Sequence, residues 1–455
     1  MANTELREAL TAAGASALIP KVIDPVLVEY QRRYSPLVRS IPSIPWNADI
    51  YTFNQRTQNA SGGFVIDGGA TVMANSTYVQ SNFSMKHLQV VGGVTGYAQA
   101  VTQDVIGNLR QSEVDGAIKG TYWDMETALL WGNSASTLSG AQPQFDGLDT
   151  QVSTFTGGNQ NAIDAGGATL ALRHLDQAID LLETNAAMQV FDSSWMFVMS
   201  SSANSKLSQL LQANQWFADK VEIAAGLIVP TYRNIPIIKS SFLQGRGFSM
   251  GTVTTATATT GGTLAAATYY YKVSAVIARQ GEVPVSAEVN QVTTGATSTV
   301  TLSFSTPTGL EGAQPILYKV YRSTATNTET FLGYVDATVG LAADGITPIL
   351  TTSIVDDGAK LTPKNGATAP ANPPATYVGT NASLLPPSSG QENIYLMSRD
   401  RNFVVRPRVR EAIPLDVYPT ATSPDSLPFA LVSDTTLAVR APKYLTRLAR
   451  VSPSL

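Results

Sequence analysis

The chain has 455 residues, of which 44% are hydrophobic and only 14% charged, and its formal net charge is −4. This length corresponds to roughly three domains, and the hydrophobic content is sufficient for packed cores. The slight negative charge gives no overall attraction to nucleic acid or to an anionic membrane. Because an average soluble protein has about 25% charged residues, much of this surface must be neutral, which favours permanent association with other chains.

The sequence contains no cysteine, which excludes disulfides, thiolate zinc sites, iron–sulfur clusters and thiol catalysis. It also lacks a phosphate-binding glycine loop, a nucleophile elbow and a zinc-protease helix motif. Its two histidines, His87 and His174, are expected to be ordinary surface or helix-face residues. We therefore expect no catalytic residue, no metal site and no cofactor. No apolar stretch approaches about 18 residues, so no membrane span is expected.

The first elements form an arm and a hairpin. Residues 1–49 contain a short helical segment followed by repeated prolines, which predicts an N-terminal arm that cannot pack as one element. Residues 50–97 are strand-like at both ends with glycines between them, which predicts one long hairpin. A lone hairpin is marginally stable, so we expect it to lie on another copy or, alternatively, on its own domain. The residues predicted to make the intersubunit contact are Gly62, Gly63, Asp67, Gly68 and Gly69.

Two amphipathic helices and a buried strand follow the hairpin. Apolar residues at spacings of three and four predict a long helix over 104–131, with Asp104 as its N-cap. A second helix is predicted over about 168–184, before an apolar strand at 195–199 and a short helix at 202–213. The polar face of the second helix carries Asp176, Asp180 and Glu183.

The composition changes over residues 251–365, where threonine is frequent and tryptophan, methionine and histidine are missing. Runs such as 271–275, 300–304 and 316–320 alternate with a period of two between turn residues, which predicts an antiparallel β-sandwich. Residues 366–375 are expected to be the linker back to the rest of the chain. A module with its own core, inserted in this way, is expected to be dispensable for assembly.

Three local phrases accompany this order of elements. The long helix ends in Trp-Gly-Asn at 131–133 and is followed by Pro-Gln-Phe-Asp-Gly-Leu at 143–148. The apolar strand continues through Ser200 into the helix containing Ser-Lys-Leu at 205–207, and Asn-Ile-Pro-Ile-Ile-Lys-Ser follows at 234–240. Together with the order of elements, these phrases resemble the major capsid proteins of tailed bacteriophages, whose fold is named after phage Hong Kong ninety-seven.

The resemblance implies an α+β capsid fold in which 50–97 is the extended loop and 104–131 is the spine helix. Residues 98–250 and 376–455 would form the capsid core, with its peripheral and axial domains. Residues 251–365 resemble fibronectin type III or immunoglobulin-like modules, which are all-β sandwiches.

The function implied by the resemblance is structural, without enzymatic activity. Hexamers and pentamers of the chain would self-assemble into the icosahedral head of a tailed phage around double-stranded DNA, with the sandwich on the outer surface and no membrane involved. Because the segment before residue 50 is short, a separate scaffolding protein is expected, together with a portal protein. The protein would reside in the virion after assembly in the bacterial cytoplasm. Alternatives are an encapsulin-like compartment shell and a secreted carbohydrate-active enzyme with a fibronectin-like module.

A basic strand is predicted near the C-terminal end, where Arg406, Arg408 and Arg410 alternate with apolar residues. These arginines could be solvated with weak ion pairs, could face packaged DNA, or could pair with carboxylates. We favour carboxylate pairing over DNA because the chain as a whole is acidic. The possible acidic partners are Asp176, Asp180 and Glu183.

Overall fold

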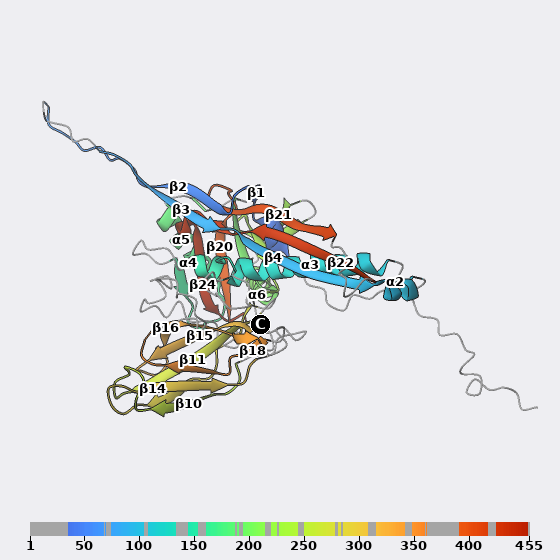
Figure 1. The fold of residues 1–455 in the computed structure, drawn as a ribbon. Helices are drawn as coiled ribbons and strands as arrows, with labels where there is room; N and C mark the ends of the chain where they lie inside the picture. Colours follow the sequence, from blue (N-terminus) through green and yellow to red (C-terminus); the bar gives the residue numbers. More distant parts are fainter. Residues whose placement is uncertain are drawn as a thin grey trace, which may run out of the picture.

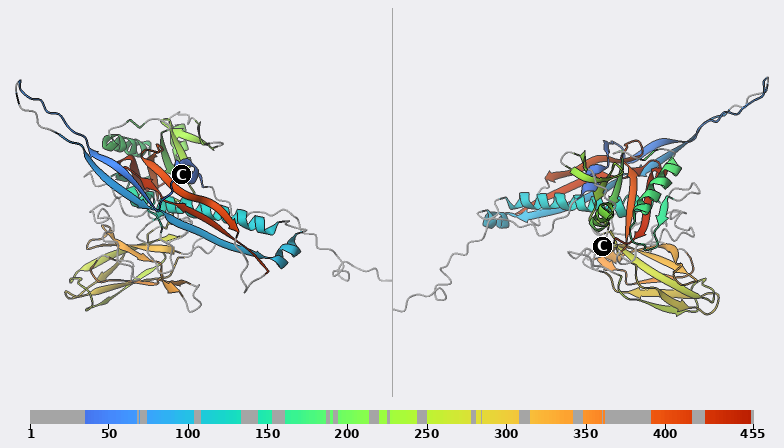
Figure 2. Two further views of the ribbon diagram at one scale, coloured as in Figure 1. Left: turned by 45° about the horizontal axis from the view of Figure 1, so that its top comes forward. Right: turned by 180° about the vertical axis from the view of Figure 1, so that it is seen from behind.

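The computed structural model shows a central body from which a thin hairpin projects at one end, with a separate β-rich lobe packed below it (Figures 1 and 2). The residues that the structure describes are 35–67, 69, 74–103, 108–132, 144–152, 161–186, 189–190, 194–213, 220–224, 227–243, 250–277, 281–283, 285–307, 315–341, 348–359, 361, 391–416 and 425–453. The predicted N-terminal helix, Asp104, Gly68 and the linker 366–375 lie outside these ranges. No helix within these ranges is both long and apolar enough to cross a membrane.

A seven-stranded mixed sheet forms the centre of the body, in the order β5-β24-β20-β6-β9-β8-β7. Its strands are β5 (Ala162–Asp164), β24 (Leu445–Val451), β20 (Glu392–Ser398), β6 (Trp195–Met199), β9 (Ile235–Lys239), β8 (Leu227–Tyr232) and β7 (Lys220–Ala224). Every residue of β6 and β20 is buried, as the apolar run at 195–199 predicts for a central strand. Strands far apart in sequence are therefore neighbours in one sheet.

Helices cover both faces of this sheet. Because side chains alternate along a strand, Trp195, Phe197 and Met199 belong to one apolar cluster, while Met196 and Val198 belong to another. The first cluster is completed by α5 (Leu172–Ala186) and α6 (Ser201–Ala213). The second is completed by α1 (Pro36–Ser40), α3 (Leu109–Trp131) and α4 (Leu148–Val152).

Helix α3 is the predicted long helix. Its N-cap is Asn108, whose side chain accepts a hydrogen bond from the Gln111 N–H. Apart from Val114, its buried residues lie in the second half, from Thr121 to Trp131. The second half of α3 therefore supplies the core, whereas the first half runs out along β4 and β22 (Figure 1).

The predicted hairpin is shorter than expected. Strand β2 (Ile50–Gln58) pairs with β3 (Thr77–Ser84), but β4 (Lys86–Thr95) pairs along its whole length with β22 (Ser426–Thr435). A period-two pattern does not reveal which strand will be the partner, and the interpretation of 50–97 as one hairpin was wrong for this reason. Gly92 helps to fix the observed pairing, because an added Cβ would lie 2.6 Å from Cζ of Phe429.

Strands β4 and β22 belong to a five-stranded sheet in the order β1-β21-β22-β4, with β23 paired to β21. The remaining members are β1 (Ser43–Pro45), β21 (Val404–Asp416) and β23 (Ala438–Val439). The parallel pairing of β1 with residues 406–408 attaches the end of the N-terminal arm to the C-terminal part of the chain.

The β-rich lobe contains two larger sheets around a third apolar cluster. One sheet has the order β10-β14-β19; the other has the order β12-β11-β15-β16, with β13 paired to β11, and a small β17–β18 pair lies beside them. The strands are β10 (Val253–Ala258), β11 (Thr268–Ile277), β12 (Gly281–Glu282), β13 (Val289–Val292), β14 (Thr299–Phe304), β15 (Pro315–Ser323), β16 (Thr330–Asp336), β17 (Thr338–Leu341), β18 (Pro348–Leu350) and β19 (Ser353–Asp356). The fibronectin-like or immunoglobulin-like identity of this sandwich remains a prediction.

Candidate intersubunit surfaces

The root of the hairpin is held by a row of aromatic rings. Trp46, Tyr51, Phe53 and Phe83 follow one another with ring centroids 4.8, 5.9 and 6.0 Å apart. The guanidinium of Arg440 lies over two of these rings, 5.5 Å from the Tyr51 centroid and 5.9 Å from that of Phe53, and also donates a hydrogen bond to the Tyr51 hydroxyl. These contacts fix the direction in which the hairpin leaves the body.

The tip of the hairpin carries three consecutive exposed apolar residues. Phe64 is fully exposed, Ile66 is 83% exposed and Val65 is 53% exposed. Such a run is unfavourable in water unless a partner covers it. The predicted contact residues lie beside this run: Gly62 and Gly63 have open space around them, and Asp67 and Gly69 follow it.

A second exposed apolar surface lies at the opposite end of the described part of the chain, on the short helix α2 (Gly96–Thr102) (Figures 1 and 2). This helix has no buried residue, although its N-cap Thr95 accepts a hydrogen bond from the Ala98 N–H. Tyr97 and Val101 are 75% and 62% exposed, and their spacing of four places them on one face of the helix.

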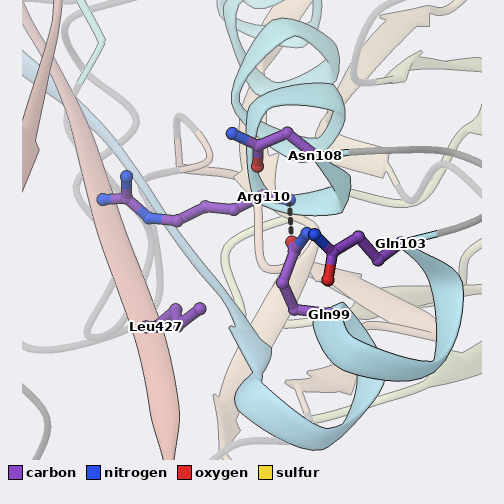
Figure 3. Close-up of a pocket in the computed structure, with 5 residues that line it drawn as sticks. All are labelled: Gln99, Gln103, Asn108, Arg110 and Leu427. Carbon is purple, nitrogen blue, oxygen red and sulfur yellow. Dashed lines mark hydrogen bonds between the residues drawn. The ribbon is translucent and has the colours of Figure 1, made fainter.

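Next to α2 is an open pocket of about 570 Å³ (Figure 3). Its lining consists of Gln99, Gln103, Asn108, Arg110 and Leu427. The Arg110 N–H donates to Oε1 of Gln99 over 3.1 Å, which joins α2 to the start of α3. Amide side chains, one guanidinium and one exposed leucine suit a peptide segment better than a small charged metabolite.

The predicted basic strand lies in β21, but its arginines do not share one exposed face. Arg406 is buried, pairs with Glu411 and contacts Sδ of Met125, and burial lowers its pKa to about 10. Arg408 also pairs with Glu411 and is partly exposed. The expected alternation is wrong because β21 shifts register after Arg408 and again after Arg410.

Arg410 and His87 bind the same carboxylate, that of Asp434, across three neighbouring strands. Burial alone would raise the pKa of Asp434, but the hydrogen bonds from Arg410 and His87 lower it. His87 is thus an exposed ion-pair partner. His174, by contrast, is buried at the first turn of α5, where its Nδ1 accepts a hydrogen bond from the Ala171 N–H.

The acidic face of α5 is not the partner of these arginines within one chain. Asp176 accepts a hydrogen bond from the Tyr232 hydroxyl at 2.7 Å and lies 3.1 Å from Nη2 of Arg233. Glu183 accepts a hydrogen bond from the Val190 N–H, and Asp180 is exposed. The proposed pairing is wrong within one copy, because Glu411 and Asp434 are closer to the arginines in the same sheet; between copies it stays a prediction.

Two of the buried carboxylates link elements of the body, and neither was predicted from the sequence. The first is Glu126, on α3, whose Oε2 accepts hydrogen bonds from the N–H groups of Leu37 and Val38 at 3.0 and 3.2 Å. Its Oε1 accepts one from the Ser240 hydroxyl at 2.9 Å. Burial raises the pKa of Glu126 to about 8 despite these three hydrogen bonds. Glu126 thus ties the first turn of α1 to the long helix.

The second is Asp149, on α4, which accepts from Nη1 of Arg447 at 2.7 Å and from the Tyr395 hydroxyl at 2.9 Å. The sequence phrase at 143–148 positions it. The Gly147 N–H donates to the carbonyl of Gly132, and an added Cβ at Gly147 would lie only 2.6 Å from the Ala128 carbonyl oxygen. This close approach of the two backbone segments packs α4 against the end of α3.

Within the described ranges, no group of three or more histidine, aspartate or glutamate side chains is arranged to hold a metal ion. The remaining surface features are an exposed hairpin tip, an exposed helix at the other end and a basic strand whose arginines are paired within the chain. The remaining buried features are the carboxylates of Glu126 and Asp149, which link elements of the body. A chain of this kind is suited to assembly with further copies.

Comparison with protein families shows which proteins part of the chain resembles. Residues 69–246 match the family model of the SU10 major capsid protein. This match spans the distal hairpin, β4, α3, α5 and the central strands β6 to β9, and it confirms the resemblance predicted from the sequence. Over these residues the chain is similar to a phage major capsid protein, and its own structure is of the α+β class.

Solved structures with similar folds are remote in sequence. The SrpI encapsulin of Synechococcus elongatus PCC 7942 is 11% identical, with 98% of each chain covered and a TM-score of 0.49. A solved structure from Gordonia phage Cozz is 9% identical, with 99% of this chain and 98% of that chain covered and a TM-score of 0.49. The capsid of a native GTA particle is 9% identical over 98% and 99% of the two chains, with a TM-score of 0.48. A search of curated proteins finds no match.

Proposed function

We propose that copies of this capsid protein form the hexamers and pentamers of an icosahedral head around double-stranded DNA, and that the β2–β3 hairpin is a principal contact between neighbouring copies. The observation that carries this is the exposed run at Phe64, Val65 and Ile66, at the far end of a hairpin whose root alone packs against the body in the described part of the chain. A separate scaffolding protein, a portal protein and assembly in the host cytoplasm belong to the same proposal.

The surface offered to the hairpin tip is the opposite end of the next copy. The exposed Tyr97 and Val101 of α2 provide apolar area, and Arg110 in the adjacent pocket provides a cation for Asp67 at the tip. Two different patches at opposite ends of one chain make a head-to-tail contact, and such contacts close into rings when the rotation between copies is suitable. Rings of five and six copies are the units that a closed icosahedral shell needs.

The absence of cysteine from the chain makes this contact directly testable. We would introduce Phe64→Cys, label it with a photoreactive maleimide and irradiate assembled particles. Crosslinks to residues 96–110 or to Leu427 of a second copy are expected. Val292→Cys, which also replaces an exposed apolar residue but lies in the sandwich, is the matched control.

Adducts confined to one chain, in particles that still assemble, would overturn the role of the hairpin as an intersubunit contact. If the purified chain forms no particle or ring under any condition that favours assembly, the proposed shell is itself wrong. Particles that assemble from the chain but contain packaged enzymes instead of DNA would identify a compartment shell and overturn the proposed cargo.

A further inference from the structure

The sandwich is attached to the body by side-chain packing as well as by its two chain connections. Along β15, Tyr318 and Val320 point into the core of the sandwich, whereas Leu317 and Tyr321 belong to the apolar cluster of the capsid core. Leu317 and Tyr321 are each 1% exposed. The sheet that contains β15 is therefore buried on both faces, unlike the outer sheet of a free-standing sandwich.

The partners of this face come from the long helix and the central sheet. Val276 of β11 joins Leu317 and Tyr321 in the cluster that also contains Trp123 and Trp131 of α3. The sandwich therefore covers the end of α3 that carries most of its buried residues. Without it, two tryptophans at the end of α3 would lose part of their cover.

A buried charge crosses the same junction. Lys319, the residue between Val320 and Tyr318 on β15, lies with its Nζ 3.3 Å from Oδ2 of Asp149 and 6.0 Å from the ring centroid of Trp131. It is only 8% exposed. Asp149 thus holds one cation from the capsid core, Arg447, and one from the sandwich.

The electrostatics of Asp149 depend on both cations. Burial alone would raise its pKa, but the charges of Arg447 and Lys319 and the hydrogen bonds from Arg447 and Tyr395 lower it to about 2. A buried carboxylate that loses one of its cations is costly, because neither water nor another charge replaces the lost partner.

We infer that the sandwich is a structural part of the capsid core. Leu317, Lys319 and Tyr321 complete the packing around α3 and Asp149, so the body and the sandwich unfold as one unit. This replaces the expectation that the inserted module is dispensable. It also holds for the unassembled chain, so its test does not depend on the proposed shell.

The position of the tryptophans allows a direct test. All five lie outside residues 251–365, so the tryptophan signal comes from the body, including Trp123 and Trp131 at the junction with the sandwich. Leu302→Ala would weaken the sandwich from within, because Leu302 is fully buried in the other sheet and belongs only to the sandwich cluster. Hydrogen exchange of the β14 peptide would report on the sandwich in the same samples.

If the inference holds, Leu302→Ala lowers the midpoint of the tryptophan-reported thermal transition by several degrees, together with the transition reported at β14. A tryptophan transition that stays at the wild-type temperature while β14 loses protection earlier would overturn it. Either result is obtained on a folded chain that keeps every junction residue.

A double-mutant cycle tests the charged contact itself. Asp149→Asn and Lys319→Met should be coupled, with a combined effect on the unfolding equilibrium at least tenfold away from the product of the single effects. Lys272→Met is the matched control, because the Lys272 ammonium binds Glu329 inside the sandwich at 3.0 Å and should be independent of Asp149→Asn. Independence of Lys319→Met as well would overturn the role assigned to Lys319.

Discussion

The hairpin and the sandwich are both β-structures that extend from the same body, but they treat their apolar residues in opposite ways. The hairpin places Phe64, Val65 and Ile66 in water, whereas the sandwich buries Leu317 and Tyr321 against the capsid core. Exposed apolar residues contribute nothing to the stability of the single chain, whereas apolar residues that are already buried stabilise it. The difference separates an apolar surface that the single chain leaves exposed from one that it already buries.

The largest expected effect is at Asp149, on the folding side of the comparison. Asp149→Ala leaves Arg447 and Lys319 buried without their shared carboxylate and should lower the free energy of unfolding by about 3–5 kcal/mol. Denaturant unfolding of the unassembled protein measures this. Asp180→Ala, on the exposed face of α5, is the control and should change stability by less than about 0.5 kcal/mol. A small loss at Asp149 would mean that the junction contributes little to folding.

Asp149 also gives a pH dependence with a defined sign. Because its pKa is lowered from 3.8 to about 2 in the folded state, it stabilises the fold above pH 4. That stabilisation should be lost as the pH falls from about 4 to about 2. Asp149→Asn should flatten this part of the stability profile, measured by thermal unfolding across the acid range.

Glu126 should act in the opposite direction. Its pKa is raised from 4.5 to about 8, so the folded state keeps a proton that the unfolded chain has lost, and stability should fall as the pH rises from about 4.5 to 8. Protonated Glu126 can donate to the Ser240 hydroxyl while still accepting from Leu37 and Val38. Glu126→Gln imitates that form and should match the wild type near pH 4.5 but exceed its stability at pH 8. If Glu126→Gln and the wild type lose equal stability between pH 4.5 and pH 8, the pH dependence comes from other titratable groups.

A smaller effect is expected in the basic strand. Arg408→Gln and Arg410→Gln remove partly exposed ion pairs and should each change stability only slightly. Arg406→Gln should cost more, because Arg406 is buried. Thermal unfolding at low and high salt would show the difference, since salt screens only the exposed pairs. Equal salt dependence for all three would contradict the structural distinction among them.

The smallest effect on stability belongs to the hairpin tip. Replacing Phe64, Val65 and Ile66 together by serine should leave the unfolding free energy of the single chain within about 0.5 kcal/mol of the wild type, because all three are exposed. Particle formation, followed by sedimentation, should be abolished. Leu317→Ala provides the contrast: it should lower stability by about 2–5 kcal/mol. If the serine variant forms normal particles, the exposed residues at the hairpin tip are not needed for assembly.

Local pattern predicted the elements better than it predicted their partners. The apolar run at 195–199 specified a buried central strand, and the spacing of three and four specified α3, because both signals are contained within one segment. The partner of β4 was missed, since its alternation is equally compatible with β3 and with β22, which lies more than three hundred residues further along the chain.

The buried charges left weaker signals. Lys319 is a single cation within the alternating run at 316–320. Of the two acids between Tyr122 and Leu129, Glu126 falls on the helix face of these apolar residues, at spacings of four and three. A lone charge on an otherwise apolar face predicts a buried partner, but the sequence does not identify that partner. Asp149 gives no such signal, because its helix is five residues long and its cations come from β15 and β24.

The row of rings at the root of the hairpin has a mechanical consequence. From Phe53 to Phe64 an extended chain spans about 36 Å at roughly 3.3 Å per residue. A rotation of about 5° at the root therefore displaces the tip by about 3 Å, the width of one hydrogen-bonded contact. The Arg440 guanidinium, which lies over Tyr51 and Phe53, holds the root about which the hairpin would rotate. If the hairpin tip contacts a neighbouring copy as proposed, the strength of this contact between Arg440 and the rings limits the range of angles at which two copies can meet, and hence the curvature of the shell they form.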